Sequence, residues 1–293
     1  MAQVDKRTLL VAFVTIISIL LTPVASTPCL PRLLIIGTQK AGTTFLGAML
    51  NQHPNLTTPR YEIHYFDKKK TPPTAAEYRT LFDCEDGQVS FDKTPMYLFC
   101  RGCPKKVKEV VPHARFVVLL RQPIARFVSS VKMDCSAYRL RNLEVLNNMN
   151  IKDIREAENC VYAKTLPDAI RLCPWKVSRL ARGCYAESLL NWFNYFPRDQ
   201  FLILNFEDLV RDPQRVGNQI LEHIGLSANF TFPLQTAYNH QRPKPLRSEC
   251  SNLHVGNKTR AMMEGFYHPC MRRLEDLLLN VSSWHPWEHW WSV

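Results

Sequence analysis

The chain has 293 residues, of which 46% are hydrophobic and 11% aromatic, so it can bury a full core and is not a disordered protein. Its 37 basic and 26 acidic side chains give a formal net charge of +11. That excess favours partners with dense negative charge: nucleic acid, an anionic membrane face, a phosphorylated cofactor or a polyanionic glycan. Glycine (10) is scarcer than proline (20), which excludes collagen-like and linker-rich chains.

The first 26 residues have the layout of a secretory signal. Lys6 and Arg7 precede an uncharged run over residues 9–21, and small residues follow it. A run of that length is short for a membrane span, which needs about 20 residues. We therefore expect a signal peptide or signal-anchor at residues 1–26, a single folded domain at residues 27–293, and entry into the secretory pathway.

Ten cysteines in an oxidising compartment are expected to pair mostly as disulfides, with a connectivity that the sequence leaves open. Cys100 and Cys103 form a lone C-x-x-C pair, which could be half of a redox or metal site. Without a second pair of this kind, a structural disulfide is favoured. Four sequons for N-linked glycosylation point to the same compartment, and they begin at Asn55, Asn229, Asn257 and Asn280.

Strand, loop and helix alternate along the chain. The unbroken apolar run at residues 33–36 predicts a strand buried on both faces that ends at Gly37. A helix is expected from residue 43 or 44 to about residue 51. A second buried strand at residues 116–120 leads past Pro123 into a helix whose apolar side chains recur at helical spacing.

The second half of the chain continues this pattern. A third strand at residues 201–204 leads by way of residues 212–213 into a helix closed by Gly225, and a late helix spans about residues 259–279. A short strand is also expected at residues 89–91. Repeated strand-to-helix units predict an α/β fold with a central parallel sheet and helices on both faces.

The loop after the first strand carries the sharpest functional signal. Small residues let backbone N–H groups close around a phosphate, and a helix N-terminus adds partial positive charge there. The spacing of Gly37 and Gly42 matches a Walker A loop, but Thr43 stands where an NTPase needs lysine, and the lysine has moved to Lys40. The second strand ends at Arg121 rather than at an aspartate for Mg²⁺. The sequence thus predicts a P-loop-like three-layer domain with a phosphate cradle and no metal ion.

Four segments in chain order carry a family resemblance. Residues 40–44 look like a 5′-phosphosulfate-binding loop, and residues 61–66 resemble an E-x-H-F-F segment. Residues 92–97 are similar to D/E-K-S/T-P-x-Y, and residues 120–129 to the 3′-phosphate motif L-R-x-P-x-x-R-x-x-S. Together they resemble the carbohydrate sulfotransferases of the secretory pathway that use 3′-phosphoadenosine 5′-phosphosulfate (PAPS), of the heparan sulfate and chondroitin 4-sulfate 6-O sulfotransferase type. Later landmarks at residues 183–185, 206–209 and 266–269 extend the resemblance, which covers residue 33 to about residue 279, nearly the whole chain after the signal segment.

The resemblance implies an enzyme that moves the sulfuryl group of PAPS to a hydroxyl of an acidic, glycosaminoglycan-like glycan. It implies PAPS as co-substrate without a metal ion, and no nucleic-acid partner. It also implies a place in the Golgi lumen, either as a secreted protein or as a single-pass type II membrane protein held by an uncleaved N-terminal segment.

Sulfuryl transfer needs a base for the acceptor hydroxyl, cations for the developing charge, and in-line positioning. The resemblance makes Glu62 the base and assigns His64 to orientation and proton support, although histidine could be the base instead, as it is in cytosolic sulfotransferases. Lys40 is expected at the oxygen that bridges phosphate and sulfur, and Lys93 at the sulfuryl oxygens. The expected donor-binding residues are Lys40, Ala41, Gly42, Thr43, Thr44, Arg121, Ser129, Lys258 and Arg260.

Other interpretations stay open at this point. Arg126 is as compatible with the protein surface as with a phosphate site. The tryptophans near the C-terminus fit sugar stacking or an apolar plug on the domain, and they are Trp284, Trp287, Trp290 and Trp291. The same donor site could serve a small-molecule or protein-tyrosine sulfotransferase. A non-catalytic polyanion-binding protein with this fold would have the basic charge but no need of Glu62.

Overall fold

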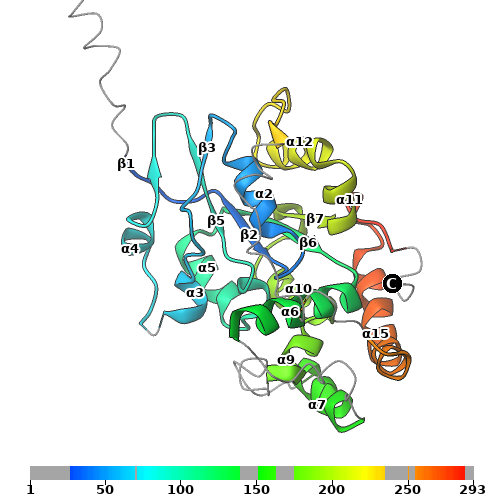
Figure 1. Cartoon of the computed structure of the whole chain (residues 1–293). Helices are drawn as coiled ribbons and strands as arrows, with labels where there is room; N and C mark the ends of the chain where they lie inside the picture. Colours follow the sequence, from blue (N-terminus) through cyan, green and yellow to red (C-terminus); the bar gives the residue numbers. More distant parts are fainter. Residues whose placement is uncertain are drawn as a thin grey trace, which may run out of the picture.

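The computed structural model describes residues 27–69, 71–138, 151–162, 175–234, 250 and 255–287 (Figure 1). The predicted signal segment lies outside them, and no helix within them is long and apolar enough to cross a membrane. A parallel sheet with strand order β3-β5-β2-β6-β7 forms the centre. Its strands are β3 (Leu56–Thr57), β5 (Val89–Lys93), β2 (Leu33–Gly37), β6 (Arg115–Leu120) and β7 (Phe201–Asn205), while β1 (Thr27–Pro28) and β4 (Asp83–Cys84) form a separate antiparallel pair.

Alternating side chains of the central strands divide the core into two layers. Leu33 and Ile35 face one layer and Leu34 and Ile36 face the other, and all four are fully buried. The first layer contains α2 (Thr43–Leu50), α11 (Phe206–Arg211) and α12 (Pro213–His223) (Figure 1). The second contains α5 (Cys103–Val110), α6 (Pro123–Tyr138), α10 (Tyr185–Phe193) and α15 (Asn257–Leu278). The remaining elements are α3 (Tyr65–Lys68), α4 (Ala75–Arg79), η1 (Tyr97–Phe99), α7 (Ile151–Tyr162), α9 (Trp175–Ala181) and η3 (Arg198–Gln200).

The three-layer α/β prediction is confirmed, and the three buried strands form where apolar runs predict them. Several described helices have no counterpart in the sequence interpretation, namely α3, α4, α5, α7, α9, α10 and α11. Of these, α11 fills the residues between β7 and α12. The Asp212 side chain caps α12 by accepting a hydrogen bond from the Arg215 N–H at 3.0 Å, and Pro213 opens that helix. This cap separates α12 from α11, so the two helices are distinct.

Three of the four disulfides in the described part link distant segments, as expected for an oxidising compartment. The Cys135–Cys250 bridge spans 115 residues, and a loop of that length loses much conformational freedom in the unfolded state. The C-x-x-C pair closes on itself as a disulfide. The side chains of Cys160 and Cys173 lie outside the described part. The bridges are Cys29–Cys84, Cys100–Cys103, Cys135–Cys250 and Cys184–Cys270.

Candidate active site

Three neighbouring strands bring the predicted site residues to one edge of the sheet. Lys93 at the end of β5 pairs in register with Ile35 of β2, and Gly37 at the end of β2 pairs with Val118 of β6. Arg121 follows the last residue of β6. Carboxyl ends of parallel strands share one edge, where ligands bind in open α/β sheets. The edge therefore carries Lys93, the loop after Gly37, and Arg121 side by side.

The loop between β2 and α2 has a backbone that only certain residues adopt. Lys40 has φ 75° and Gly42 has φ 80°, both in the left-handed region. A Cβ at Gly42 would also lie 3.1 Å from the Phe206 ring and 3.2 Å from Leu209, so glycine is required there for two reasons. The loop leads directly into the N-terminus of α2, where the backbone N–H groups of the first turn and the helix dipole favour an anion. This helix N-terminus supports the predicted phosphate cradle, although the Ala41 N–H already donates to the Thr38 carbonyl oxygen at 3.1 Å.

Two half-buried cations border this loop. The Arg121 guanidinium donates to the Lys40 carbonyl oxygen at 2.9 Å and lies 4.3 Å from the centre of the Phe206 ring. Burial, and then the neighbouring Arg121, lowers the pKa of Lys40, and Asp134 partly offsets the effect. Burial likewise lowers the pKa of Arg121, and Glu207 opposes that shift. A bound anion would stabilise these two positive charges, which lie close together and partly out of water. The loop is therefore suited to a polyphosphate-like ligand.

Charged side chains that were not predicted as site residues lie beside the loop. The guanidinium groups of Arg179 and Arg182 lie 3.5 Å and 3.4 Å from the Gln39 side-chain oxygen, and Arg179 forms an ion pair with the buried Asp134. Arg126 is fully buried and donates to the Arg179 carbonyl oxygen, so the surface interpretation of Arg126 is wrong. These contacts join α6 and α9 to the phosphate loop.

The remaining expected donor-binding residues lie in the loop and on three helices. Thr43 is buried and Thr44 is exposed in the first turn of α2, while Ala41 is buried in the loop. Ser129 is half-buried on α6. The first turn of α15, which packs against α6 and α10, contains Lys258 and Arg260. Within the described residues, no group of three His, Cys, Asp or Glu side chains could hold a metal ion.

A second cluster surrounds Glu62, in the loop before α3. The His64 Nε2 atom is 3.3 Å from Glu62 Oε2, and the His64 Nδ1 atom is 2.9 Å from Asp67 Oδ2. The Lys93 Nζ atom lies 3.7 Å from Glu62 Oε1. The Glu62 side chain is 32% exposed whereas that of Lys93 is 10% exposed. A carboxylate that solvent can reach is therefore held between a buried lysine and an imidazole, with Asp67 behind the imidazole.

A buried acid fixes the backbone that carries this cluster. Three hydroxyl groups donate to the Asp92 carboxylate at 2.6–2.9 Å, those of Thr94, Tyr78 and Tyr97. Burial raises the pKa of Asp92, while the three hydrogen bonds oppose the shift. The Tyr97 hydroxyl also accepts from the Tyr65 N–H at 2.9 Å, and the Thr94 hydroxyl accepts from the His64 N–H at 3.4 Å. The network thus fixes the position of His64 through the hydrogen bond from the His64 backbone N–H to Thr94.

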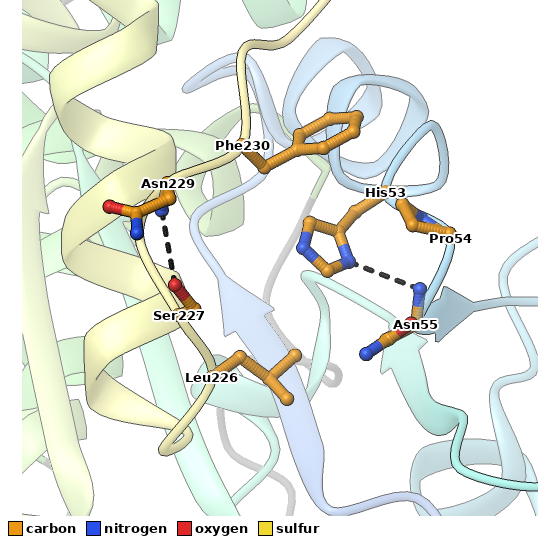
Figure 2. Close-up of a pocket in the computed structure, with 7 residues that line it drawn as sticks. All are labelled: His53, Pro54, Asn55, Leu226, Ser227, Asn229 and Phe230. Carbon is orange, nitrogen blue, oxygen red and sulfur yellow. Dashed lines mark hydrogen bonds between the residues drawn. The ribbon is translucent and has the colours of Figure 1, made fainter.

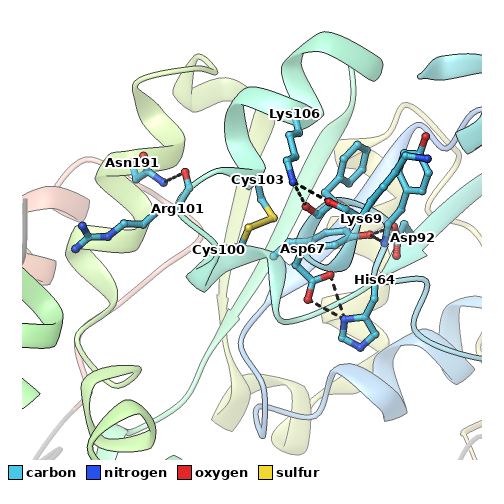
Figure 3. Close-up of a disulfide and its surroundings, with 12 residues drawn as sticks. His64, Asp67, Lys69, Asp92, Cys100, Arg101, Cys103, Lys106 and Asn191 are labelled. Atoms are coloured by element: carbon cyan, nitrogen blue, oxygen red, sulfur yellow. Dashed lines mark hydrogen bonds and ion pairs between the residues drawn. A yellow bond between two sulfur atoms is a disulfide. The ribbon is translucent and has the colours of Figure 1, made fainter. Parts of the chain in front are cut away.

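Helix α5 braces the other end of α3 (Figure 3). The Lys106 ammonium donates to the carbonyl oxygens of Phe66 at 3.0 Å and Lys69 at 3.4 Å. The Cys100–Cys103 disulfide joins the end of η1 to the start of α5, directly after Tyr97 and its hydrogen bonds. The short helix with Asp67 is thus fixed from both sides.

The C-terminal segment packs against the start of α11, next to Arg121. The Trp287 indole N–H donates to Glu207 Oε2 at 2.7 Å, and His285 Nε2 lies 2.8 Å from Asp208 Oδ2. Trp284 is buried in the core layer of α15. The apolar-plug interpretation is therefore correct for Trp284, while Trp290 and Trp291 lie outside the described residues.

Comparison with known proteins agrees with this fold. The chain matches the sulfotransferase domain over residues 30–266. It is similar to heparan sulfate glucosamine 3-O-sulfotransferase 6 of Homo sapiens, with 28% identity over 280 residues that cover 89% of this chain and 77% of that protein. Heparan sulfate glucosamine 3-O-sulfotransferase 3B1 of Homo sapiens is 26% identical over 270 residues, which cover 87% of this chain and 65% of that protein.

A sulfotransferase from Alicyclobacillus acidocaldarius has the same fold, with a TM-score of 0.63 and 22% sequence identity over 86% of this chain and 96% of that one. The domain match spans most of the chain, and it includes the phosphate loop, Glu62, Lys93 and Arg121. The chain therefore belongs to the sulfotransferase family.

Proposed function

We propose that this protein transfers the sulfuryl group of PAPS to a hydroxyl of an acidic glycosaminoglycan related to heparan sulfate. One observation carries the proposal: a carboxylate that solvent can reach, Glu62, lies beside Lys93 at the same sheet edge as Arg121 and the loop of Lys40. The named relatives favour a glycan over a small molecule or a tyrosine peptide. The net charge of +11 suits an acidic acceptor.

The donor is expected to lie along the loop with its two phosphate ends on different elements. Backbone N–H groups of residues 42–44 at the N-terminus of α2 would hold the 5′-phosphosulfate, with Ala41 shaping the loop beside it. Arg121 and Ser129 would bind the 3′-phosphate, for which a guanidinium is a bidentate donor. The first turn of α15, with Lys258 and Arg260, would cover the nucleotide.

The transfer itself moves one group and one proton. The acceptor oxygen attacks sulfur as Glu62 takes the hydroxyl proton, and the bond between sulfur and the bridging oxygen breaks. Negative charge then develops on the 5′-phosphate of the departing 3′,5′-diphosphoadenosine, where Lys40 would stabilise it, while Lys93 would neutralise the sulfuryl oxygens. His64 and Asp67 would orient the Glu62 carboxylate.

We place the protein in the Golgi lumen as a glycoprotein. The disulfides support an oxidising compartment, and the sequons and the layout of residues 1–26 support entry into the secretory pathway. Residues 1–26 would act as a signal peptide or as a signal-anchor, and residues 27–293 as the sulfotransferase domain.

The test of this function is direct. The secreted domain is incubated with labelled PAPS and a panel of desulfated glycosaminoglycans, neutral glycans and tyrosine peptides. Label is expected in a glycosaminoglycan. Label in a tyrosine peptide alone would overturn the acceptor assignment. No transfer to any acceptor would favour the polyanion-binding alternative.

Product nucleotide should stabilise the protein more than ATP does. A ligand that binds only the folded state at 100 times its Kd contributes about 2.7 kcal/mol, which corresponds to a rise in Tm of about 5–10 °C for a domain of this size. We expect such a rise with 3′,5′-diphosphoadenosine and a much smaller one with ATP and Mg²⁺, measured by differential scanning fluorimetry. Equal protection by ATP that depends on the metal would indicate a kinase-like site instead.

Alanine at Gly47 should lower activity without lowering stability. A Cβ there would lie 2.9 Å from Lys93 Cδ, so Lys93 must shift, and misplacement by ~1 Å can cost a factor of 10² in rate. We expect sulfuryl transfer to fall about 10- to 100-fold. Alanine favours a helix interior over glycine by about 1 kcal/mol, so Tm should not fall.

Gly265 offers a matched control in the exposed part of α15, where an added Cβ meets nothing within 4 Å. Gly265→Ala should raise Tm by about 2–4 °C and leave the transfer rate unchanged. If Gly47→Ala keeps the full rate, Lys93 does not act at the sulfuryl group.

A further inference from the structure

A surface hollow of about 270 Å³ lies at the end of α2 that is opposite the phosphate loop (Figure 2). Because α2 has 8 residues, about 12 Å of helix separates the loop from this end. A volume just below the usual range of ligand pockets, which begins at about 300 Å³, suits one sugar ring better than an oligosaccharide. The hollow is lined by His53, Pro54, Asn55, Leu226, Ser227, Asn229 and Phe230.

Two of the four sequon asparagines lie on the rim of this one hollow. Asn55 and Asn229 are both exposed, and they come from segments far apart in sequence. Figure 2 shows the Asn55 side chain directed across the hollow toward Leu226, whereas the Asn229 side chain is directed away from His53. Of the two asparagines, only Asn55 therefore directs its side-chain amide into the hollow.

The walls of the hollow are held by hydrogen bonds that leave the Asn55 amide available. The backbone of Asn55 accepts from the Val89 N–H at 2.8 Å, and its N–H donates to His53 Nδ1 at 3.1 Å. On the opposite rim, the Phe230 carbonyl oxygen accepts from the Gln214 side chain at 2.8 Å. The His53 and Phe230 rings meet edge to face with centroids 4.6 Å apart. The hollow is preformed, with apolar walls.

We propose that Asn55 is N-glycosylated and that the first sugar, N-acetylglucosamine, occupies this hollow against Leu226 and Phe230. The proposal rests on the luminal location in the proposed function. A lipid-linked diphosphate oligosaccharide supplies the glycan: the Asn55 amide nitrogen bonds to the anomeric carbon, that carbon's bond to the diphosphate oxygen breaks, and the amide loses one proton. The C–H face of the sugar then packs on the aromatic and aliphatic walls, and its polar groups remain in water.

The experiment compares trimmed forms of the full chain secreted from cells that add high-mannose glycans. Glycopeptide mass spectrometry should find Asn55 occupied. Endoglycosidase H leaves one N-acetylglucosamine on each asparagine, so it should leave Tm within about 1 °C of the untreated protein. Asn55→Gln removes that sugar as well, and Tm should fall by about 2–4 °C, the shift expected for loss of one moderate apolar contact in a domain of this size.

Asn280→Gln is the matched control, because Asn280 is an exposed sequon after α15 and outside the hollow. It should lose its glycan with no change in Tm. An unoccupied Asn55 beside an occupied Asn280 would overturn the proposal, as would a Tm fall on endoglycosidase H treatment as large as that of Asn55→Gln. An unchanged Tm in Asn55→Gln would do the same.

Sulfuryl transfer is measured on the same samples and separates this inference from the proposed function. Asn55 lies beyond the far end of α2, so Asn55→Gln should transfer at the wild-type rate. Transfer without a glycan on Asn55 refutes only the sugar site. A glycan on Asn55 with the expected Tm pattern supports the sugar site even if no acceptor is sulfated.

Discussion

Replacing Lys40 with alanine is expected to reduce both donor binding and sulfuryl transfer. Lys40 is half-buried beside Arg121, and its ammonium would face the charge that develops on the bridging oxygen. A hydrogen bond to a charged group contributes about 1.5–3 kcal/mol, so diphosphoadenosine should bind about 10- to 100-fold more weakly. Loss of one group that stabilises a developing charge lowers kcat by about 10²- to 10³-fold. Calorimetry and single-turnover kinetics measure the two effects separately.

The pH dependence distinguishes the charge of Lys40 from its bulk. Burial and Arg121 lower the pKa of Lys40, so its charge is present below that pKa and is lost at a lower pH than for an ordinary lysine. Donor affinity should therefore decline on the alkaline side in the wild type. Lys40→Arg keeps the charge to higher pH and should show a flatter profile. Identical profiles in both proteins would mean that Lys40 does not bind the anion.

Sequence alone predicts the parts of this site that depend on local pattern. The strand at residues 33–36 is a continuous apolar run because helices cover both of its faces. Gly42 is identifiable from its spacing because a left-handed backbone packed against Phe206 excludes other residues. Lys93 and Arg121 follow from their places at strand ends, since parallel strands bring such positions together.

Contacts between distant segments have no comparable local signal. Gln39 and Arg179 are 140 residues apart, and Asp134 reaches Arg179 from a third element, so only the packing of α6 and α9 brings them together. Asp67 is different, because its spacing of three residues from His64 is the spacing of neighbours on a helix and could have been recognised. Helix α11 is short, and the strong cap at Asp212 marks only the start of the next helix.

Replacing Glu62 with glutamine should abolish most of the catalysis and leave donor binding nearly intact. Glutamine keeps the size of the side chain and can still hydrogen-bond to His64, but it cannot take the acceptor proton. A general base contributes about 10²- to 10⁴-fold, so the rate of sulfuryl transfer should fall by that factor. Binding of diphosphoadenosine, followed by calorimetry, should stay within a few-fold of the wild type because Glu62 is not part of the phosphate loop.

His64→Asn separates the two candidate bases. The His64 ring faces carboxylates through both nitrogens, Glu62 at 3.3 Å and Asp67 at 2.9 Å, so in this arrangement it orients Glu62 rather than the acceptor. We expect the loss in His64→Asn to be smaller than that in Glu62→Gln. If Glu62→Gln keeps most of its activity while a folded His64→Asn protein has none, histidine is the base. The half-buried Glu62 carboxylate, with Lys93 beside it, would then serve to bind or orient the imidazole.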